Sequence, residues 1–348
     1  MKKTLALMLA LLFVFTAFAL TACNGSNDDG DKESTTESTG NTENATETVK
    51  LGFGVAVTAS ATDADAEAEK PNGKGTATVT VAAVTLDKNG KILSCEIDCA
   101  DASVAYTPAG EAIANDGFKT KYELGYDYNM ITFAGSEKEW FEQVDTFEAL
   151  VVGKTATEVK ALVLEDGFGA DSVVSAGCTI AVADFVKAVV KATENTIDTE
   201  ATTADTLKLG AYTEQTTRDA NEDANGYQKL ETTFVAATVN AEGKITAATF
   251  DCVQVQFDFD ASGASAFDAS KEISSKRELG FDYNMVNYQV SEKEWFEQAD
   301  VFASLCIGKT AAEIVAMMAE DNYGTADVKG AGCTILVNGF AKAAAKLG

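Results

Sequence analysis

The feature of the sequence that most restricts its fold is an internal duplication. The segment KYELGYDYNM at 121–130 returns as KRELGFDYNM at 276–285, and the octet SEKEWFEQ at 136–143 returns unchanged at 291–298. At this offset of 155 residues the chain aligns without a gap over 121–191, and more than half of the positions are identical. We therefore predict two tandem copies of one domain, each about 145 residues long, a common size for a single domain.

Composition divides the rest of the chain. Residues 23–49 are rich in Asp, Glu, Ser, Thr and Asn and hold almost no apolar side chain, so they bury too little surface to fold. We predict a signal peptide at 1–22, a lipidated cysteine with a disordered acidic tether at 23–49, a first repeat at 50–192, a polar linker at 193–206 and a second repeat at 207–348.

The N-terminal segment predicts where the protein is located. It opens with two lysines, continues through an apolar run and closes on Leu20-Thr21-Ala22-Cys23, a pattern typical of a secretory signal peptide. Its end resembles a bacterial lipobox, in which the cysteine is lipidated and becomes the new N-terminus. The resemblance implies an extracytoplasmic lipoprotein that is anchored to the cell membrane by lipid on Cys23. An uncleaved membrane anchor is the alternative.

Charge and the lack of histidine exclude several functions. The formal net charge of −27 repels nucleic acid and anionic lipid head groups, so we expect no nucleic-acid partner and no membrane contact except through the lipid. The chain has no histidine. This excludes Ser-His and Cys-His nucleophile pairs and removes the commonest zinc and copper ligand, so we expect no metal site.

Each repeat begins with segments that have the periodicity of β-strands. In the first repeat, two such segments flank residues 87–90, whose Asn-Gly pair is typical of a hairpin turn. The apolar residues of 93–99 alternate with polar ones and are predicted to share one face, as are those of 253–259. Helical patterns follow in both repeats. We predict an α+β fold of two tandem homologous domains, each a small antiparallel sheet followed by helices.

The repeated octet SEKEWFEQ predicts the start of a helix. Ser136 and Glu139 have capping-box spacing, and Trp140 opens an apolar stripe that we expect to end at Gly153. A second capping box is expected at 155–158. Core packing explains the tryptophan but not the polar residues retained around it. A shared contact with a ligand or with the other repeat, and a recent duplication, remain as explanations.

A short loop of small residues is also repeated. Ala176-Gly177-Cys178-Thr179 returns at 331–334, and each copy precedes an amphipathic helix. A threonine at this junction is predicted either to cap the helix or, with the amides behind it, to bind an anion.

These loops, with the strand pairs around Gly-Lys-Ile at 90–92 and 243–245, resemble the bacterial FMN-binding domain family. That family occurs in subunits of redox complexes and in flavin-bearing lipoproteins. In it, a flavin transferase esterifies FMN phosphate onto the threonine of a Ser-Gly-Ala-Thr motif that follows an aspartate. The resemblance implies an extracytoplasmic flavoprotein.

The resemblance also implies which residues hold the cofactor. It assigns this role to the glycine, the cysteine and the acceptor threonine of each loop: Gly177, Cys178, Thr179, Gly332, Cys333 and Thr334. Asp171 and Asp327 would be the upstream acidic residues. Alanine and cysteine stand where the family has serine and alanine, so the attachment motif is degenerate.

The repeated segment Asp-Tyr-Asn-Met offers a second set of candidates. Two aromatic rings, two amides and two thioethers suit a planar ligand such as a flavin ring, but they also suit packing of the loop onto the sheet. The residues are Tyr128, Asn129, Met130, Tyr283, Asn284 and Met285.

Six cysteines remain after Cys23. Two pairs are present in both repeats, Cys99 with Cys178 and Cys252 with Cys333, and an extracytoplasmic location permits disulfides between them. The alternative is that all six are small apolar core residues.

Two functions follow as hypotheses. The first is a lipoprotein that carries one FMN per repeat and transfers electrons to a redox partner protein outside the membrane. The flavin would supply the chemistry, and whether the protein is also an enzyme stays open. The alternative is a cofactor-free surface lipoprotein that binds a small molecule or a protein partner. The first requires the hydroxyls of Thr179 and Thr334 at the mouth of a pocket, whereas the second needs them only as helix caps.

Overall fold

The structure is a computed structural model that describes residues 47–348. The predicted signal peptide, Cys23 and nearly all of the tether lie outside this range. The described residues form one compact unit of antiparallel sheets and helices, which confirms the predicted α+β class. None of its helices is long and apolar enough to cross a membrane.

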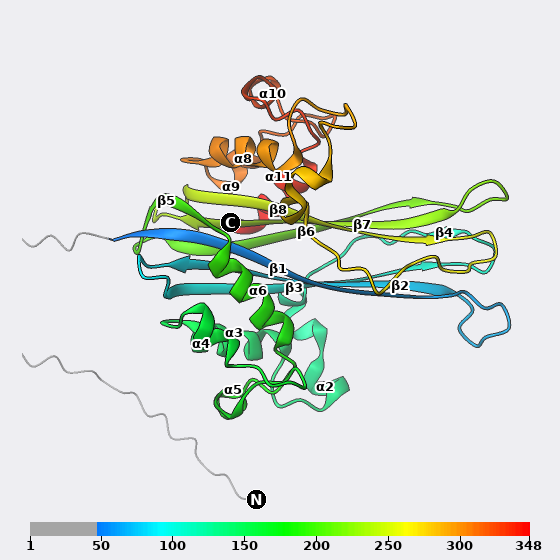
Figure 1. Ribbon diagram of the computed structural model, residues 1–348, viewed down its shortest axis with the longest axis horizontal. Coiled ribbons are helices and arrows are strands. Elements are labelled where there is room, and N and C mark those ends of the chain that lie inside the picture. Colours follow the sequence, from blue (N-terminus) through cyan, green and yellow to red (C-terminus); the bar gives the residue numbers. More distant parts are fainter. Residues whose placement is uncertain (1–46) are drawn as a thin grey trace, which may run out of the picture. The chain divides into compact units, whose positions relative to one another are not determined.

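Eight strands form two antiparallel sheets (Figure 1). The first sheet has the order β4-β3-β2-β1-β5 and the second has the order β6-β7-β8. The strands are β1 (Thr48–Thr62), β2 (Gly73–Leu86), β3 (Ile92–Tyr106), β4 (Ala112–Ile113), β5 (Thr196–Thr202), β6 (Thr206–Arg218), β7 (Gly226–Val239) and β8 (Ile245–Phe259).

In each repeat short helices follow the first strands, β1–β4 or β6–β8, and the order of the helices is the same except that α2 has no counterpart in the second repeat and η3 has none in the first. The first repeat has α1 (Lys121–Leu124), the 3₁₀ turn η1 (Gly125–Tyr128), α2 (Met130–Ala134), α3 (Trp140–Val151), α4 (Ala156–Lys160), α5 (Asp171–Ala176) and α6 (Ala183–Glu194). The second has α7 (Lys276–Leu279), η2 (Gly280–Tyr283), α8 (Trp295–Cys306), α9 (Ala311–Val315), α10 (Ala326–Ala331), α11 (Asn338–Ala344) and η3 (Ala345–Leu347).

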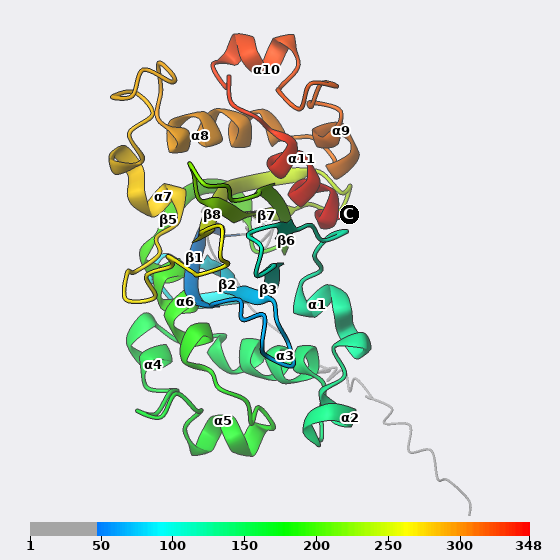
Figure 2. The ribbon, with the colours of Figure 1, turned by 90° about the vertical axis from the view of Figure 1, so that its right-hand side faces the viewer.

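The two sheets pack face to face, and helices cover the outer face of each (Figures 1 and 2). A hydrophobic core between the sheets joins residues of both repeats. In it Phe53 packs against Phe234, with ring centroids 6.1 Å apart. Each sheet also has one hydrophobic core on its other face, between the sheet and the helices of the same repeat. The repeats therefore share one interior, and the finer prediction of two separate domains is not confirmed.

The alternating segments behave as predicted with one exception. Val253, Val255 and Phe257 face the core between the sheets, as predicted. Cys95, Ile97 and Cys99 share a face that packs against the first-repeat helices. Leu93 was predicted to join that face, but it is 38% exposed. The pairing shifts there, because Leu86 pairs with Ile92 whereas Thr85 pairs with Ser94, which leaves Leu93 as an unpaired bulge residue.

The segment 193–206 is more ordered than a linker. It contains β5, which pairs with β1 in antiparallel register, Leu51 opposite Ile197. Its polar sequence is consistent with an edge strand, where one side of the backbone faces solvent.

Glycines at matching places let the last helix of each repeat approach its sheet. A Cβ on Gly54 would lie 2.1 Å from the carbonyl oxygen of Ala188 in α6, and one on Gly210 would lie 2.3 Å from that of Ala343 in α11. Any larger residue would displace the helix, and with it the Gly-Cys-Thr loop that precedes the helix.

The helix of the octet begins three residues later than predicted. α3 starts at Trp140 with Glu139 as N-cap, and the capping box is formed by Glu139 and Glu142. The predicted box of Ser136 and Glu139 is therefore wrong, and the second repeat confirms the new boundary with α8 starting at Trp295. The box predicted at 155–158 is confirmed, and Gly153 has φ +80° just after the helix end.

Candidate functional site

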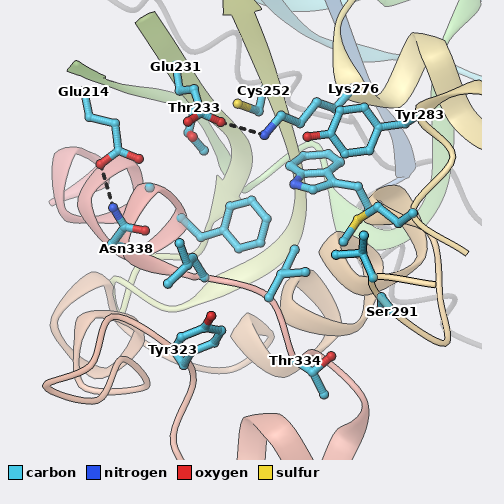
Figure 3. Close-up of a pocket in the computed structure, with 17 residues that line it drawn as sticks. Glu214, Glu231, Thr233, Cys252, Lys276, Tyr283, Ser291, Tyr323, Thr334 and Asn338 are labelled. Carbon is cyan, nitrogen blue, oxygen red and sulfur yellow. Dashed lines mark hydrogen bonds and ion pairs between the residues drawn. The ribbon is translucent and has the colours of Figure 1, made fainter. Parts of the chain in front are cut away.

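A cavity of about 290 Å³ lies in the second repeat, between the outer face of its sheet and the following helices (Figure 3). Flat aromatic side chains and a few polar groups line it, which is the usual composition of a small-molecule site. The lining residues used below are Glu214, Lys276, Tyr283, Trp295, Thr334 and Asn338.

The structure brings part of the predicted site together at this cavity. Tyr283, Met285 and Thr334 line it. Gly332 and Cys333 do not, and Cys333 is fully buried. The loop therefore presents its threonine to the cavity and turns its cysteine into the core.

The repeated asparagines have a conformational role. Asn129 and Asn284 have φ of 66° and 64°, a left-handed conformation that asparagine tolerates better than most residues. The side chain of Asn284 donates a hydrogen bond to the carbonyl of Asp282, and Asn284 is not among the residues that line the cavity. The backbone of the loop is sufficient to explain these two residues.

The predicted capping role of the threonines is wrong. α6 begins at Ala183 after Val182, and neither Val182 nor its counterpart Val337 caps with a side chain. Thr179 and Thr334 lie further upstream and are exposed. Their hydroxyls are thus available for a role other than helix capping.

A buried glutamine of the octet holds each threonine. Oε1 of Gln298 accepts hydrogen bonds from the Thr334 amide (2.8 Å) and hydroxyl (3.0 Å). Its Nε2 donates to Ser291 Oγ and to the carbonyl of Lys293. In the first repeat, Gln143 and Thr179 are joined at 2.8 and 3.1 Å. The orientation of the threonine is therefore fixed from the octet.

The N-cap glutamate of the octet holds the other repeated loop. Glu294 accepts hydrogen bonds from the amides of Met285 (2.8 Å) and Val286 (3.1 Å), and Glu139 does the same for Met130 and Ile131. The octet thus connects both candidate loops in each repeat. Glu294 and Gln298 therefore have a structural role in addition to the core packing of the tryptophan.

A buried lysine lies at the base of the cavity. Lys276 Nζ is 2.9 Å from Glu231 and lies over the rings of Tyr283 (5.3 Å) and Trp295 (5.7 Å) (Figure 3). Burial by itself lowers the pKa of Lys276, but Cys252, Glu231 and Tyr283 outweigh it and raise the pKa above its usual value. The lysine is therefore a fixed positive charge against the faces of two aromatic rings.

The first repeat has the same lysine with its acid on a different strand. Lys121 lies over Tyr128 and Trp140 and is 3.5 Å from Asp101 on β3. Asp101 is paired across the strands with Thr78, and the corresponding pair in the second repeat is Gln254 with Glu231. The carboxylate has moved to the opposite position of the same cross-strand pair. Both arrangements satisfy the buried charge.

The second-repeat cavity has one carboxylate that the first repeat lacks. Glu214 accepts a hydrogen bond from Asn338 Nδ2 at 2.6 Å. Burial, followed by the nearby Glu231, raises the pKa of Glu214. In the first repeat, Thr58 is paired with Thr78. In the second, Glu214 is paired with Glu231, the residue that corresponds to Thr78. The strand register therefore places Thr58 where the second repeat has Glu214. The two repeats therefore differ in polarity at this wall.

All six cysteines of residues 47–348 are buried free thiols, so neither proposed disulfide is formed. Burial raises the pKa of Cys252 and of Cys333 to about 11, which keeps both protonated at neutral pH. Cys178 has the same environment as Cys333, in the core beneath its loop. The six cysteines are therefore small apolar core residues, which was the alternative to disulfides.

Sequence reasoning missed several residues of the site. Gln298, Glu294 and Lys276 are identical in both repeats, and that identity was the available signal. Glu214 and Asn338 are not repeated, so only the fold could bring them to the cavity. The predicted upstream residues Asp171 and Asp327 lie exposed in α5 and α10, and neither lines the cavity.

Searches against models of protein families, curated proteins and solved structures found no match for this chain. Within residues 47–348 no cluster of three or more cysteine, aspartate or glutamate side chains has a geometry that would hold a metal ion.

Proposed function

We propose that this protein is a membrane-anchored extracytoplasmic lipoprotein that carries FMN on Thr179 and Thr334, one in each FMN-binding-like repeat, and transfers electrons. The observation that carries the proposal is the position of Thr334. Thr334 is exposed, and Gln298 orients its hydroxyl. It lies at an aromatic-lined cavity rather than at a helix cap. This is the placement that a covalently attached planar ligand requires.

The residues present are compatible with a flavin. Small-molecule sites commonly have volumes of roughly 300–1,000 Å³, and the cavity of about 290 Å³ lies next to the lower limit. Tyr283 and Trp295 offer flat surfaces, and Lys276 offers a positive charge next to them. A bound flavin would supply one- and two-electron redox chemistry there. The protein itself would hold and orient the ring and need not turn over a substrate.

The test is the visible spectrum and intact mass of the mature protein after export from a bacterium that has the flavin transferase. We expect flavin absorption bands and a mass gain of one or two FMN, each less one water. Thr179→Val and Thr334→Val should each remove one FMN, and the double variant should be colourless. A colourless parent protein of unmodified mass would rule out covalent flavin.

The second candidate is a cofactor-free lipoprotein that binds a small molecule with hydrogen-bond donors. The Glu214 carboxylate favours it, because it lines the cavity and has no counterpart in the first repeat. The same spectrum and mass separate the two candidates, since this one predicts an unmodified chain.

A further inference from the structure

A lysine of each octet lies directly against the glycine of the Gly-Cys-Thr loop. A Cβ built on Gly332 would be 2.6 Å from Lys293 Nζ, and one built on Gly177 would be 2.6 Å from Lys138 Nζ. Both glycines have a left-handed φ, +104° and +103°. Any other residue would be strained at this φ and would push the ammonium group away from the loop.

These two ammonium groups have no acidic partner. Within residues 47–348, neither Lys138 nor Lys293 has a carboxylate oxygen within 4.0 Å of its Nζ. Both lysines are half-buried, in a chain whose net charge is −27. The buried lysines Lys121 and Lys276, by contrast, each have an acidic partner. A partly desolvated cation without a counter-ion is unfavourable by itself and suits an anionic ligand.

A purely structural role is poorly supported by the contacts. α5 and α10 end at these glycines, and a cation there could serve the last carbonyls of each helix. The hydrogen bond that Lys138 Nζ donates goes instead to Thr146 Oγ1, at 3.4 Å. Among the described residues Lys293 Nζ donates none, since Val301 takes the equivalent place in the second repeat. The lysine is kept in both copies although its neighbour is not.

We propose that Lys138 and Lys293 bind the phosphate of a phosphomonoester ligand, one site per repeat, beside Thr179 and Thr334. The naming of FMN as that ligand rests on the proposed function. The lysine carbonyl accepts from the same glutamine amide that fixes the threonine, so the cation and the hydroxyl are held in one network. A phosphate on or next to the threonine would provide the counter-ion that the lysine lacks.

The test uses the mature chain produced in a bacterium without flavin transferase, so that both threonines stay free. Inorganic phosphate and FMN are titrated separately, with backbone amide shifts at Gly177 and Gly332 and quenching of flavin fluorescence as readouts. Riboflavin, which lacks the phosphate, is the ligand control. We expect the Lys138→Met/Lys293→Met variant to bind phosphate and FMN about tenfold or more weakly and riboflavin unchanged.

Two further variants separate binding from folding. Arginine at both positions should keep phosphate binding, whereas Lys271→Met, at an exposed lysine elsewhere, should behave as the parent chain. The proposal would be overturned if the methionine variant bound phosphate and FMN as tightly as the parent chain does, or if the parent chain bound no phosphate. Lysine-dependent phosphate binding in a chain that gains no flavin mass on export would support this site and reject the proposed function.

Discussion

Replacement of Gln298 by leucine tests the structural basis of the candidate site. Gln298 is fully buried, and its amide makes four hydrogen bonds, two to Thr334 and one each to Ser291 Oγ and the Lys293 carbonyl. Leucine has a similar volume and cannot make any of them. The variant therefore removes the connection between the octet and the threonine loop with little change in packing.

The expected loss of stability depends on whether each of the four hydrogen-bond partners can bind water instead. A neutral hydrogen bond contributes about 0.5–1.5 kcal/mol net to stability. The hydroxyls of Thr334 and Ser291 are not fully buried and can bind water instead, so their bonds contribute the lower value. The Thr334 amide and the Lys293 carbonyl lose their partners. We expect the free energy of unfolding to fall by about 2–3 kcal/mol.

Urea unfolding of the mature chain, followed by tryptophan fluorescence, measures this loss, because each repeat has one tryptophan. The matched control is Glu292→Ala, an exposed residue of the same octet, which should change stability by less than about 0.5 kcal/mol. A Gln298→Leu variant as stable as this control would refute the role of the amide. If flavin is attached, the variant should also lose flavin from Thr334 and keep it on Thr179.

Three other predictions concern different parts of the chain. Glu231→Gln should lower the free energy of unfolding by about 2–4 kcal/mol, because the buried ammonium of Lys276 loses its carboxylate. Gln254→Asp should recover part of that loss in the same urea assay, and a double variant no more stable than Glu231→Gln would contradict the exchange of positions. Burial, followed by neighbouring carboxylates, raises the pKa of Glu148 to about 9 from 4.5, so its contribution to stability is present below pH 4.5 and lost as the pH rises to 9. Glu148→Gln should therefore leave the melting temperature unchanged at pH 4.5 and raise it at pH 8, and equal melting curves at pH 8 would be contrary evidence. Cys23→Ser should move the exported protein out of the membrane fraction, and retention in that fraction would argue against a lipid anchor.

The features that local pattern controls were predictable. The repeat, the Asn-Gly hairpin, the apolar face of 253–259 and the place of Trp140 in a helical core stripe all follow from residues close together in the sequence. Their burial depends on a period of two or of three to four residues, which each segment has by itself. The candidate threonines were also found this way, because their loop is repeated.

Contacts between different segments of the chain decided the rest. Ser136 and Glu139 have the spacing of a cap, but the helix begins at Trp140 because the Glu139 carboxylate also holds the amides of Met130 and Ile131.

The same reason applies to the cavity. Glu214 and Asn338 are separated by more than a hundred residues and meet only because β6 and α11 pack together. Sequence by itself determined which residues are repeated and, apart from β5 in the predicted linker, which segments are strands or helices. Tertiary structure decided what those residues contact, because hydrogen bonds and ion pairs join side chains whose separation along the chain carries no periodic signal.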